Sequence, residues 1–352
     1  MDIANADFLA GRNKFFAGAN AGSVVNDGAI TTPSGGKVFL IAPDVANSGI
    51  ITSPQGEVVL AAGHSVQLAD SSNPGMHVVV SAPADQAINI GKVIAQGGRI
   101  GIYGALVNQR GTVNANSAVV GEDGKIVFKA SRDTLLEAGS VTSATGAAQG
   151  GEVSVLGQRV ALTGDARVDA SGQTSGGTVL VGGDYQGKNA AVQNADQTVV
   201  GMDASIQADA IARGDGGKIV VWADGATSMA GRLSARGGAS GGDGGLAEAS
   251  GKQFLDFRGT ADLRAPPGHA RNWSKHCRRY NACNQEVYFV QDGWYNNQYA
   301  PRYRQQHARP PMHRPPPQHH GHQPGVRLRP AACAPDPLAA RYSEQRAGIR
   351  QG

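Results

Sequence analysis

A pair of glycines followed by a short alternating run of aliphatic residues recurs along most of this chain, and no other feature limits its fold so strongly. Full copies begin at Gly35, Gly150, Gly176 and Gly216. A unit that repeats in this way cannot bury its apolar face alone and must stack on its neighbours. The repeat therefore predicts a solenoid.

The spacing of the copies gives the length of one repeat. Successive second glycines from Gly98 to Gly177 are 26, 27 and 26 residues apart. The intervals from Gly56 to Gly98 and from Gly177 to Gly217 are longer, at 42 and 40 residues, which indicates a hidden or inserted turn in each. We expect residues 184–196, which are rich in Asn, Gln and Ala, to leave the rod as a loop or hairpin.

Short segments in which Asn and Gly interrupt aliphatic residues accompany the glycine strands, at 24–30, 45–51 and 107–113. Asn and Gly tolerate positive φ, so they mark corners of the chain. Each unit therefore reads as strand, corner, strand, corner, strand, with no helix long enough to cover a sheet. Such a chain buries its inward residues by coiling, with equivalent strands paired in parallel about 4.8 Å apart. The predicted fold is an all-β parallel β-helix of on the order of ten coils and about 50 Å.

Composition divides the chain near residue 265. Residues 1–264 hold 44 of the 50 glycines, none of the three cysteines and a net charge of −5. Residues 265–352 carry a net charge of +9 and hold 12 of the 17 prolines and seven of the nine histidines. We expect 266–352 to be a disordered, basic, Pro/His-rich low-complexity tail, either native or produced by a frameshift just after Ala265.

Five segments in the first 265 residues resemble filamentous haemagglutinin-type exoproteins of two-partner secretion systems. They are 2–11 (DIANADFLAG), 177–188 (GTVLVGGDYQGK), 215–224 (DGGKIVVWAD), 234–238 (SARGG) and 250–260 (SGKQFLDFRGT). The resemblance implies a right-handed parallel β-helix in a protein that is secreted or displayed on the cell surface of a Gram-negative bacterium. It also implies a dedicated outer-membrane transporter as partner.

By this resemblance, residues 1–70 are a remnant of the C-terminal part of a secretion domain, and 71–265 are the β-helix repeat region. The first residues lack the basic and apolar segments of a signal peptide. The secretion domain of the family also begins with a segment containing an Asn-Pro-Asn-Gly motif that this chain lacks. We therefore expect an internal piece of a larger exoprotein, which makes export of this product doubtful. No window of about 18 apolar residues predicts a membrane span.

One short motif is a candidate receptor contact. Arg213, Gly214 and Asp215 form the tripeptide that integrins recognise, in a glycine-rich corner before a repeat strand. Trp222 is expected to be a packed or coil-edge aromatic residue rather than a platform for a sugar.

No catalytic, cofactor or metal site is predicted. Asp165, Arg167 and Asp169 alternate along one strand, and Asp209 lies near Arg213 and Asp215, but both groups are interpreted as solvated outward positions. The cysteines Cys277 and Cys283 lack the spacing of a zinc site and have no second pair.

The predicted function is adhesion by a surface-exposed or secreted exoprotein fragment. Stacked coils would display loops to a host-cell receptor or glycan through many weak contacts. No nucleic-acid partner is expected. The other hypotheses are a carbohydrate-active β-helix enzyme, such as a polysaccharide lyase or hydrolase, and a truncated remnant without function.

Overall fold

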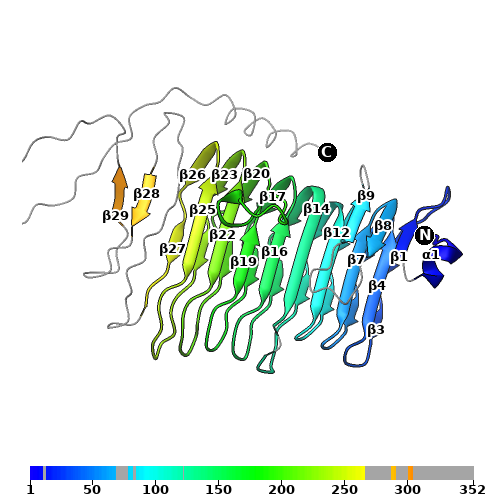
Figure 1. Ribbon diagram of the computed structural model, residues 1–352, viewed down its shortest axis with the longest axis horizontal. Coiled ribbons are helices and arrows are strands. Elements are labelled where there is room, and N and C mark those ends of the chain that lie inside the picture. The colour runs from blue at the N-terminus through cyan, green and yellow to red at the C-terminus, as the bar shows by residue number, and fades with distance from the viewer. Residues whose placement is uncertain are drawn as a thin grey trace, which may run out of the picture.

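The strands from Val24 to Asp262 form one parallel β-helix, whose coils stack side by side along the long axis of the view (Figure 1). The fold is seen in a computed structural model that describes residues 1–10, 13–68, 78–81, 85–121, 123–265, 287–290 and 300–303. The predicted all-β parallel β-helix is confirmed. Its third face is a sheet of nine strands, close to the ten coils expected from the repeat length.

Each coil contributes a strand to three faces, which we call the first, second and third face. The first face holds the glycine strands: β4 (Lys37–Ala42), β7 (Glu57–Ala62), the start of β12 (Arg99–Gln109) and of β14 (Lys125–Leu136), β16 (Glu152–Leu156), β19 (Thr178–Val181), β22 (Lys218–Ala223) and β25 (Leu246–Gly251).

The other two faces come from the shorter strands. The second face comprises β2 (Val24–Asn26), β5 (Val45–Asn47), β10 (Gln86–Asn89), the ends of β12 and β14, β17 (Arg159–Leu162), β20 (Gln197–Val200), β23 (Ala226–Met229) and β26 (Phe254–Phe257). The third comprises β3 (Ala29–Thr31), β6 (Ile50–Thr52), β11 (Lys92–Ile94), β13 (Thr112–Asn114), β15 (Val141–Ser143), β18 (Arg167–Asp169), β21 (Ser205–Gln207), β24 (Arg232–Ser234) and β27 (Thr260–Asp262).

The core is a set of aliphatic columns that run along the inside of the rod. Ile51, Val93 and Val113 pair in register on the third face, and each is fully buried. Parallel strands place equivalent side chains directly above one another, so one inward aliphatic residue per strand suffices to build a continuous column. Burial of these side chains is the main stabilising contribution.

The repeated glycines are explained by close contact between coils. A Cβ atom on Gly177 would lie 2.1 Å from the carbonyl oxygen of Gly151, and one on Gly98 would lie 2.2 Å from that of Gly56. No side chain fits at such a distance, so a glycine must precede the strand wherever neighbouring coils approach this closely. The sequence repeat is therefore a steric requirement of the stack.

The asparagines near the corners point inward and form a ladder of side-chain amides. Asn26 Nδ2 donates to Asn47 Oδ1 at 2.7 Å, Asn47 Nδ2 to Asn89 Oδ1 at 2.8 Å, and Asn89 Nδ2 to Gln109 Oε1 at 2.7 Å. Gln109 Nε2 ends the ladder on the Gly111 carbonyl at 2.9 Å. In the next coils the same position is apolar, and the column continues as Leu136, Leu162, Val200, Met229 and Phe257.

The first long interval contains an inserted hairpin. β8 (Ser65–Leu68) and β9 (Val78–Ser81) pair in antiparallel fashion, and β1 (Asn13–Phe16) adds to β8 after the short helix α1 (Asn5–Leu9). Val66 and Leu68 pack with Tyr103 against the outside of the first face. The boundary expected at residue 70 falls between the two strands of this hairpin, and the coils stack on both sides of it.

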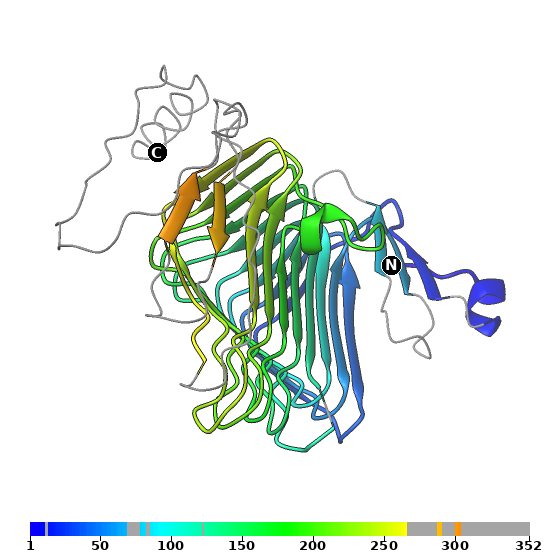
Figure 2. The same cartoon turned by 60° about the vertical axis from the view of Figure 1, so that its left-hand side comes forward.

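The second long interval contains residues 184–196, which connect β19 to β20 and include the 3₁₀ turn η1 (Tyr185–Gly187). This turn lies outside the coils, over the first face (Figure 2). Beyond residue 265 the structure describes only an antiparallel pair, β28 (Val287–Val290) and β29 (Ala300–Tyr303). The rest of the predicted tail, with Cys277 and Cys283, lies outside the described residues. Among the described helices, none is long and apolar enough to cross a membrane.

Candidate interaction surfaces

The loops that lead from the third face to the first face stack on one another and form a ridge. Isolated parallel bridges join Ser117 to Gly146, Gly146 to Gly172, and Gly172 to Ala210. The ridge therefore continues the coil-to-coil pairing beyond the regular strands. Exposed apolar side chains occur along it at Val119, Val120 and Ile211.

The tripeptide Arg213–Asp215 lies on this ridge, with the side chains of Arg213 and Asp215 exposed. Its backbone is bonded on both sides: Gly214 N donates to the Gly241 carbonyl at 2.6 Å, and Gly238 N donates to the Gly214 carbonyl at 2.9 Å. Gly214 has φ +83°, which favours glycine. The motif is thus held in one conformation, and its role in receptor binding stays a prediction.

Asp209 corrects one sequence interpretation, because it is buried rather than solvated. Its side chain is 7% exposed and accepts from Ser234 Oγ and from the backbone N of Arg236, each at 2.7 Å. Arg236 Nη2 and Nε bond the second carboxylate oxygen at 2.8 and 3.0 Å, and this contact raises the pKa of Arg236. A carboxylate satisfied by two side chains and a backbone N–H can be buried, which composition and spacing do not reveal.

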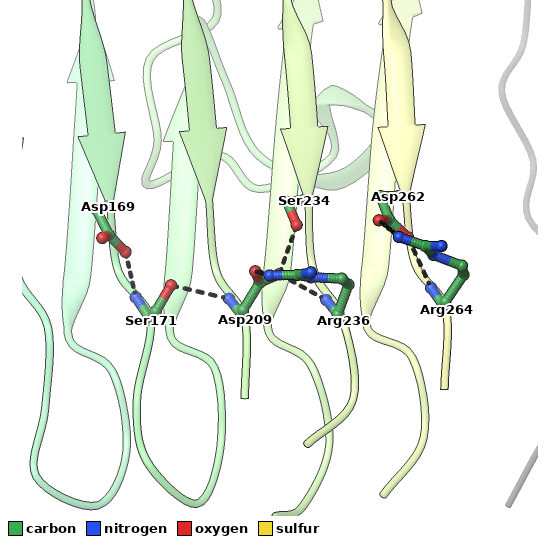
Figure 3. Close-up of polar contacts among 7 residues, drawn as sticks. All are labelled: Asp169, Ser171, Asp209, Ser234, Arg236, Asp262 and Arg264. Carbon is green, nitrogen blue, oxygen red and sulfur yellow. Dashed lines mark hydrogen bonds and ion pairs between the residues drawn. The ribbon is translucent and has the colours of Figure 1, made fainter. Parts of the chain in front are cut away.

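The same position is polar in neighbouring coils and forms a series of corner contacts (Figure 3). Asp169 Oδ1 accepts from Ser171 N at 2.8 Å, and Ser171 Oγ accepts from Asp209 N at 3.1 Å. In the last coil Arg264 bonds both oxygens of Asp262. These contacts fix the corners between the third and first faces, which is a structural role.

The residues Asp165, Arg167 and Asp169 do not assemble a catalytic group. Asp165 Oδ1 accepts from the backbone N of Gly139 at 2.7 Å, and Arg167 is exposed. The outward interpretation agrees with their positions. Within the described residues, no group of three or more His, Cys, Asp or Glu side chains could hold a metal ion.

The segment 184–196 is anchored on Trp222, whose side chain points outward from β22. Trp222 is 7% exposed, and a Cβ atom on Gly187 would lie 2.5 Å from its indole ring. Asn194 Nδ2 donates to the Gly187 carbonyl at 3.0 Å. Together with Leu180, Val220 and Val192, the indole forms a small apolar cluster under the segment. The expectation of a packed aromatic residue agrees with this position.

A charged group lies at the edge of this cluster. Lys218 Nζ donates to Asp184 Oδ1 at 2.5 Å, and Asp184 also accepts from Asn189 and from Tyr185 N. Burial alone would raise the pKa of Asp184, but these hydrogen bonds outweigh it and hold the pKa below its usual value. Glu248 is 2% exposed, and its burial raises its pKa despite hydrogen bonds from Gln186 N and Ser250.

Sequence reasoning missed a second contact between an insertion and the rod. His64 Nδ1 lies 2.8 Å from Asp85 Oδ2, so the start of the hairpin is tied to the start of β10. Asp85 is 7% exposed. Tyr103, on the first face, is also buried, and this burial raises the pKa of its hydroxyl group. The 42-residue interval between glycines was the only signal of this insertion.

Comparison with solved structures gives matches to this fold. The chain is similar to the HMW1 secretion domain from Haemophilus influenzae, known from a crystal structure, with a TM-score of 0.65 and 28% sequence identity. The match covers 74% of this chain and 73% of that chain. No protein-family model matches the chain, and no curated protein matches it.

The shared architecture and the identity over most of both chains agree with the resemblance inferred from the sequence motifs. The parallel stack of coils, the steric glycine column and this match together support a β-helical exoprotein of the two-partner secretion type.

Proposed function

We propose that this protein is an exported exoprotein unit that displays its loops to other cells, and so acts in adhesion. The observation that carries the proposal is the match of 74% of the chain to a secretion domain. The 74% of the chain that is covered is close to the share of the chain before Pro266. We therefore infer that the β-helix as a whole, rather than residues 1–70 alone, corresponds to such a domain.

The partner that this proposal requires is an outer-membrane transporter. A chain that folds only after crossing the membrane can use the folding of successive coils to prevent backsliding, because each coil adds burial and hydrogen bonds to the one before it. Residues 1–264 contain no cysteine, so no thiol in the β-helix can oxidise before the coils have formed. Both properties support passage of an unfolded chain.

Secretion with and without a transporter tests this proposal. The chain would be given a signal peptide and produced in a Gram-negative host with or without the transporter of a two-partner secretion system. We expect folded protein in the medium only when the transporter is present. Equal release in both strains, or retention in the periplasm of both, would contradict it.

Contact with a receptor or glycan is assigned to the ridge and to segment 184–196, since both protrude from a rigid rod. The exposed side chains of Arg213 and Asp215 support a contact with an integrin-like receptor. Beads coated with the protein should attach to cultured epithelial cells, and Arg213→Lys should reduce attachment if the tripeptide is the contact. Arg167→Lys, at another exposed arginine, is the matched control. Attachment no better than that of a folded control protein would rule out adhesion.

The enzyme hypothesis has less support. Its candidate Asp209 is held by Arg236 and Ser234, so it is already engaged in the corner contacts. The matched protein is a secretion domain, and secretion domains of this kind are typically non-enzymatic.

A further inference from the structure

We propose that Lys218 and Asp184 become joined by an amide bond between their side chains, with Glu248 as the proton carrier. The three residues lie together at the edge of the apolar cluster beneath segment 184–196. The cross-link would fasten this segment to the wall of the rod, and the inference does not depend on the adhesive function.

The two reacting groups are already in contact. Lys218 begins β22 and its Nζ lies 2.5 Å from Asp184 Oδ1. The carboxyl group is held in place by two further donors, Tyr185 N at 2.6 Å and Asn189 Nδ2 at 2.9 Å. Donors of this kind withdraw electron density from the carboxyl group and stabilise the negative charge that forms on its oxygen during attack by an amine.

Glu248 supplies the acid–base group that such a reaction needs. It lies on β25, where it pairs with Val220. Lys218 pairs with Leu246, which lies two residues before Glu248 and on the same face of the sheet. The side chain of Glu248 interacts electrostatically with both Lys218 and Asp184. Its burial raises its pKa, which favours the protonated acid, and its oxygens are positioned by Gln186 N at 3.1 Å and Ser250 Oγ at 2.9 Å.

One side of the pair is apolar, and the other side faces solvent. Leu180, Val220 and Trp222 are 0 to 7% exposed and are covered by segment 184–196. An uncharged amine is the nucleophile, so the reaction proceeds through the neutral form of a pair whose hydrogen bonds favour the carboxylate. The side chain of Lys218 is 34% exposed, so the water that is released can reach the solvent.

The reaction starts from the ion pair. One proton passes from Nζ to the Asp184 carboxyl group along their hydrogen bond, and the neutral Nζ attacks Cγ. Glu248 gives its proton to the departing oxygen and takes the proton that the nitrogen loses, so it ends as it began. One C–N bond forms, one C–O bond breaks, and one water molecule leaves. No oxidant, reductant or cofactor is needed.

The intact mass of the purified full-length chain tests this proposal, measured under reducing conditions on protein shown by circular dichroism to be folded. We expect a mass lower than that of the sequence by one water molecule. After trypsin digestion, peptide 168–188 should be joined to peptide 214–232, with no cleavage after Lys218, because these peptides contain the two residues.

Variants separate the proposed chemistry from simple proximity. Lys218→Arg and Glu248→Gln should both restore the full mass while keeping the fold. Lys125→Arg is the matched control, because Lys125 Nζ lies 3.0 Å from Glu152 Oε2 on the same face; this variant should keep the loss of water. Asp184→Asn should form the same cross-link by loss of ammonia. A folded wild-type chain with the full mass of its sequence, or a loss of water that persists in Lys218→Arg, would overturn the proposal.

Discussion

The four N-terminal coils and the five that follow use one inward position in two different ways. In the first group the position holds Asn26, Asn47, Asn89 and Gln109, whose amides bond from coil to coil. In the second it holds an apolar column that begins with Leu136. The backbone pairing is parallel in both groups. One coil geometry is therefore compatible with either solution, provided that neighbouring coils make the same choice.

The two solutions differ in what they specify. An amide inside the rod is satisfied only when the next coil presents its partner in register, since an unpaired buried amide is costly. An aliphatic column stabilises by burial and tolerates changes of size and register better. We infer that the amide ladder sets the register of the early coils, on which the later coils stack.

The glycine column should be indispensable in both groups. Gly98→Ala and Gly177→Ala each place a Cβ atom within 2.2 Å of a carbonyl oxygen. We expect each to destabilise the protein by more than about 4 kcal/mol, as measured by denaturant unfolding. A cost below about 1 kcal/mol at either site would show that the coils are not held at this distance.

Breaking the amide ladder in the middle should cause the next largest loss of unfolding free energy. Asn47→Leu removes the acceptor of Asn26 and the donor to Asn89, which leaves two amide groups without their partners. The expected cost is about 2–4 kcal/mol in unfolding free energy. Leu162→Met at the same position of the apolar column is the control, with an expected cost below about 1.5 kcal/mol. Equal costs for the two changes would contradict the distinction between the two groups.

Replacing the whole ladder sharpens the comparison. If Asn26, Asn47, Asn89 and Gln109 are all changed to leucine, no orphaned amide remains, and the column becomes like that of the later coils. We expect this variant to lie within about 2 kcal/mol of the wild type, far from the sum of the single costs. Additive costs would mean that the amides do not act as one chain.

The smallest predicted effect concerns pH. The pKa of Glu248 is raised in the folded protein, so the native state binds its proton more tightly than the unfolded chain does. Stability should therefore fall as pH rises from the usual carboxyl range through the raised pKa of Glu248. Thermal unfolding of Glu248→Gln across this range should lack that decline. A decline of equal size in the variant would assign it to other groups.

The sequence predicts those parts of the fold that are enforced by repetition. The glycine pairs before Arg99 and Lys218 mark strands because both meet the same steric limit against the preceding coil. Contacts made once in the molecule leave no such pattern. The burial of Asp209 depends on Arg236 in the next coil, and the packing of Trp222 depends on a segment inserted before its strand. The inserted hairpin is visible in the sequence only as an interval that is too long.

Cross-linking between introduced cysteines tests the stacked register most directly. Residues 1–264 contain no cysteine, so after Cys277, Cys283 and Cys333 are changed to serine the introduced pair holds the only thiols. Arg167 and Ser205 are direct neighbours in register although segment 184–196 lies between them. A disulfide needs Cα atoms about 4.4–6.8 Å apart, which adjacent parallel strands provide and an offset of two residues exceeds. We predict rapid oxidation of the Arg167→Cys/Ser205→Cys pair and little of the Arg167→Cys/Gln207→Cys pair. Equal rates, or the opposite order, would contradict the β-helix described above.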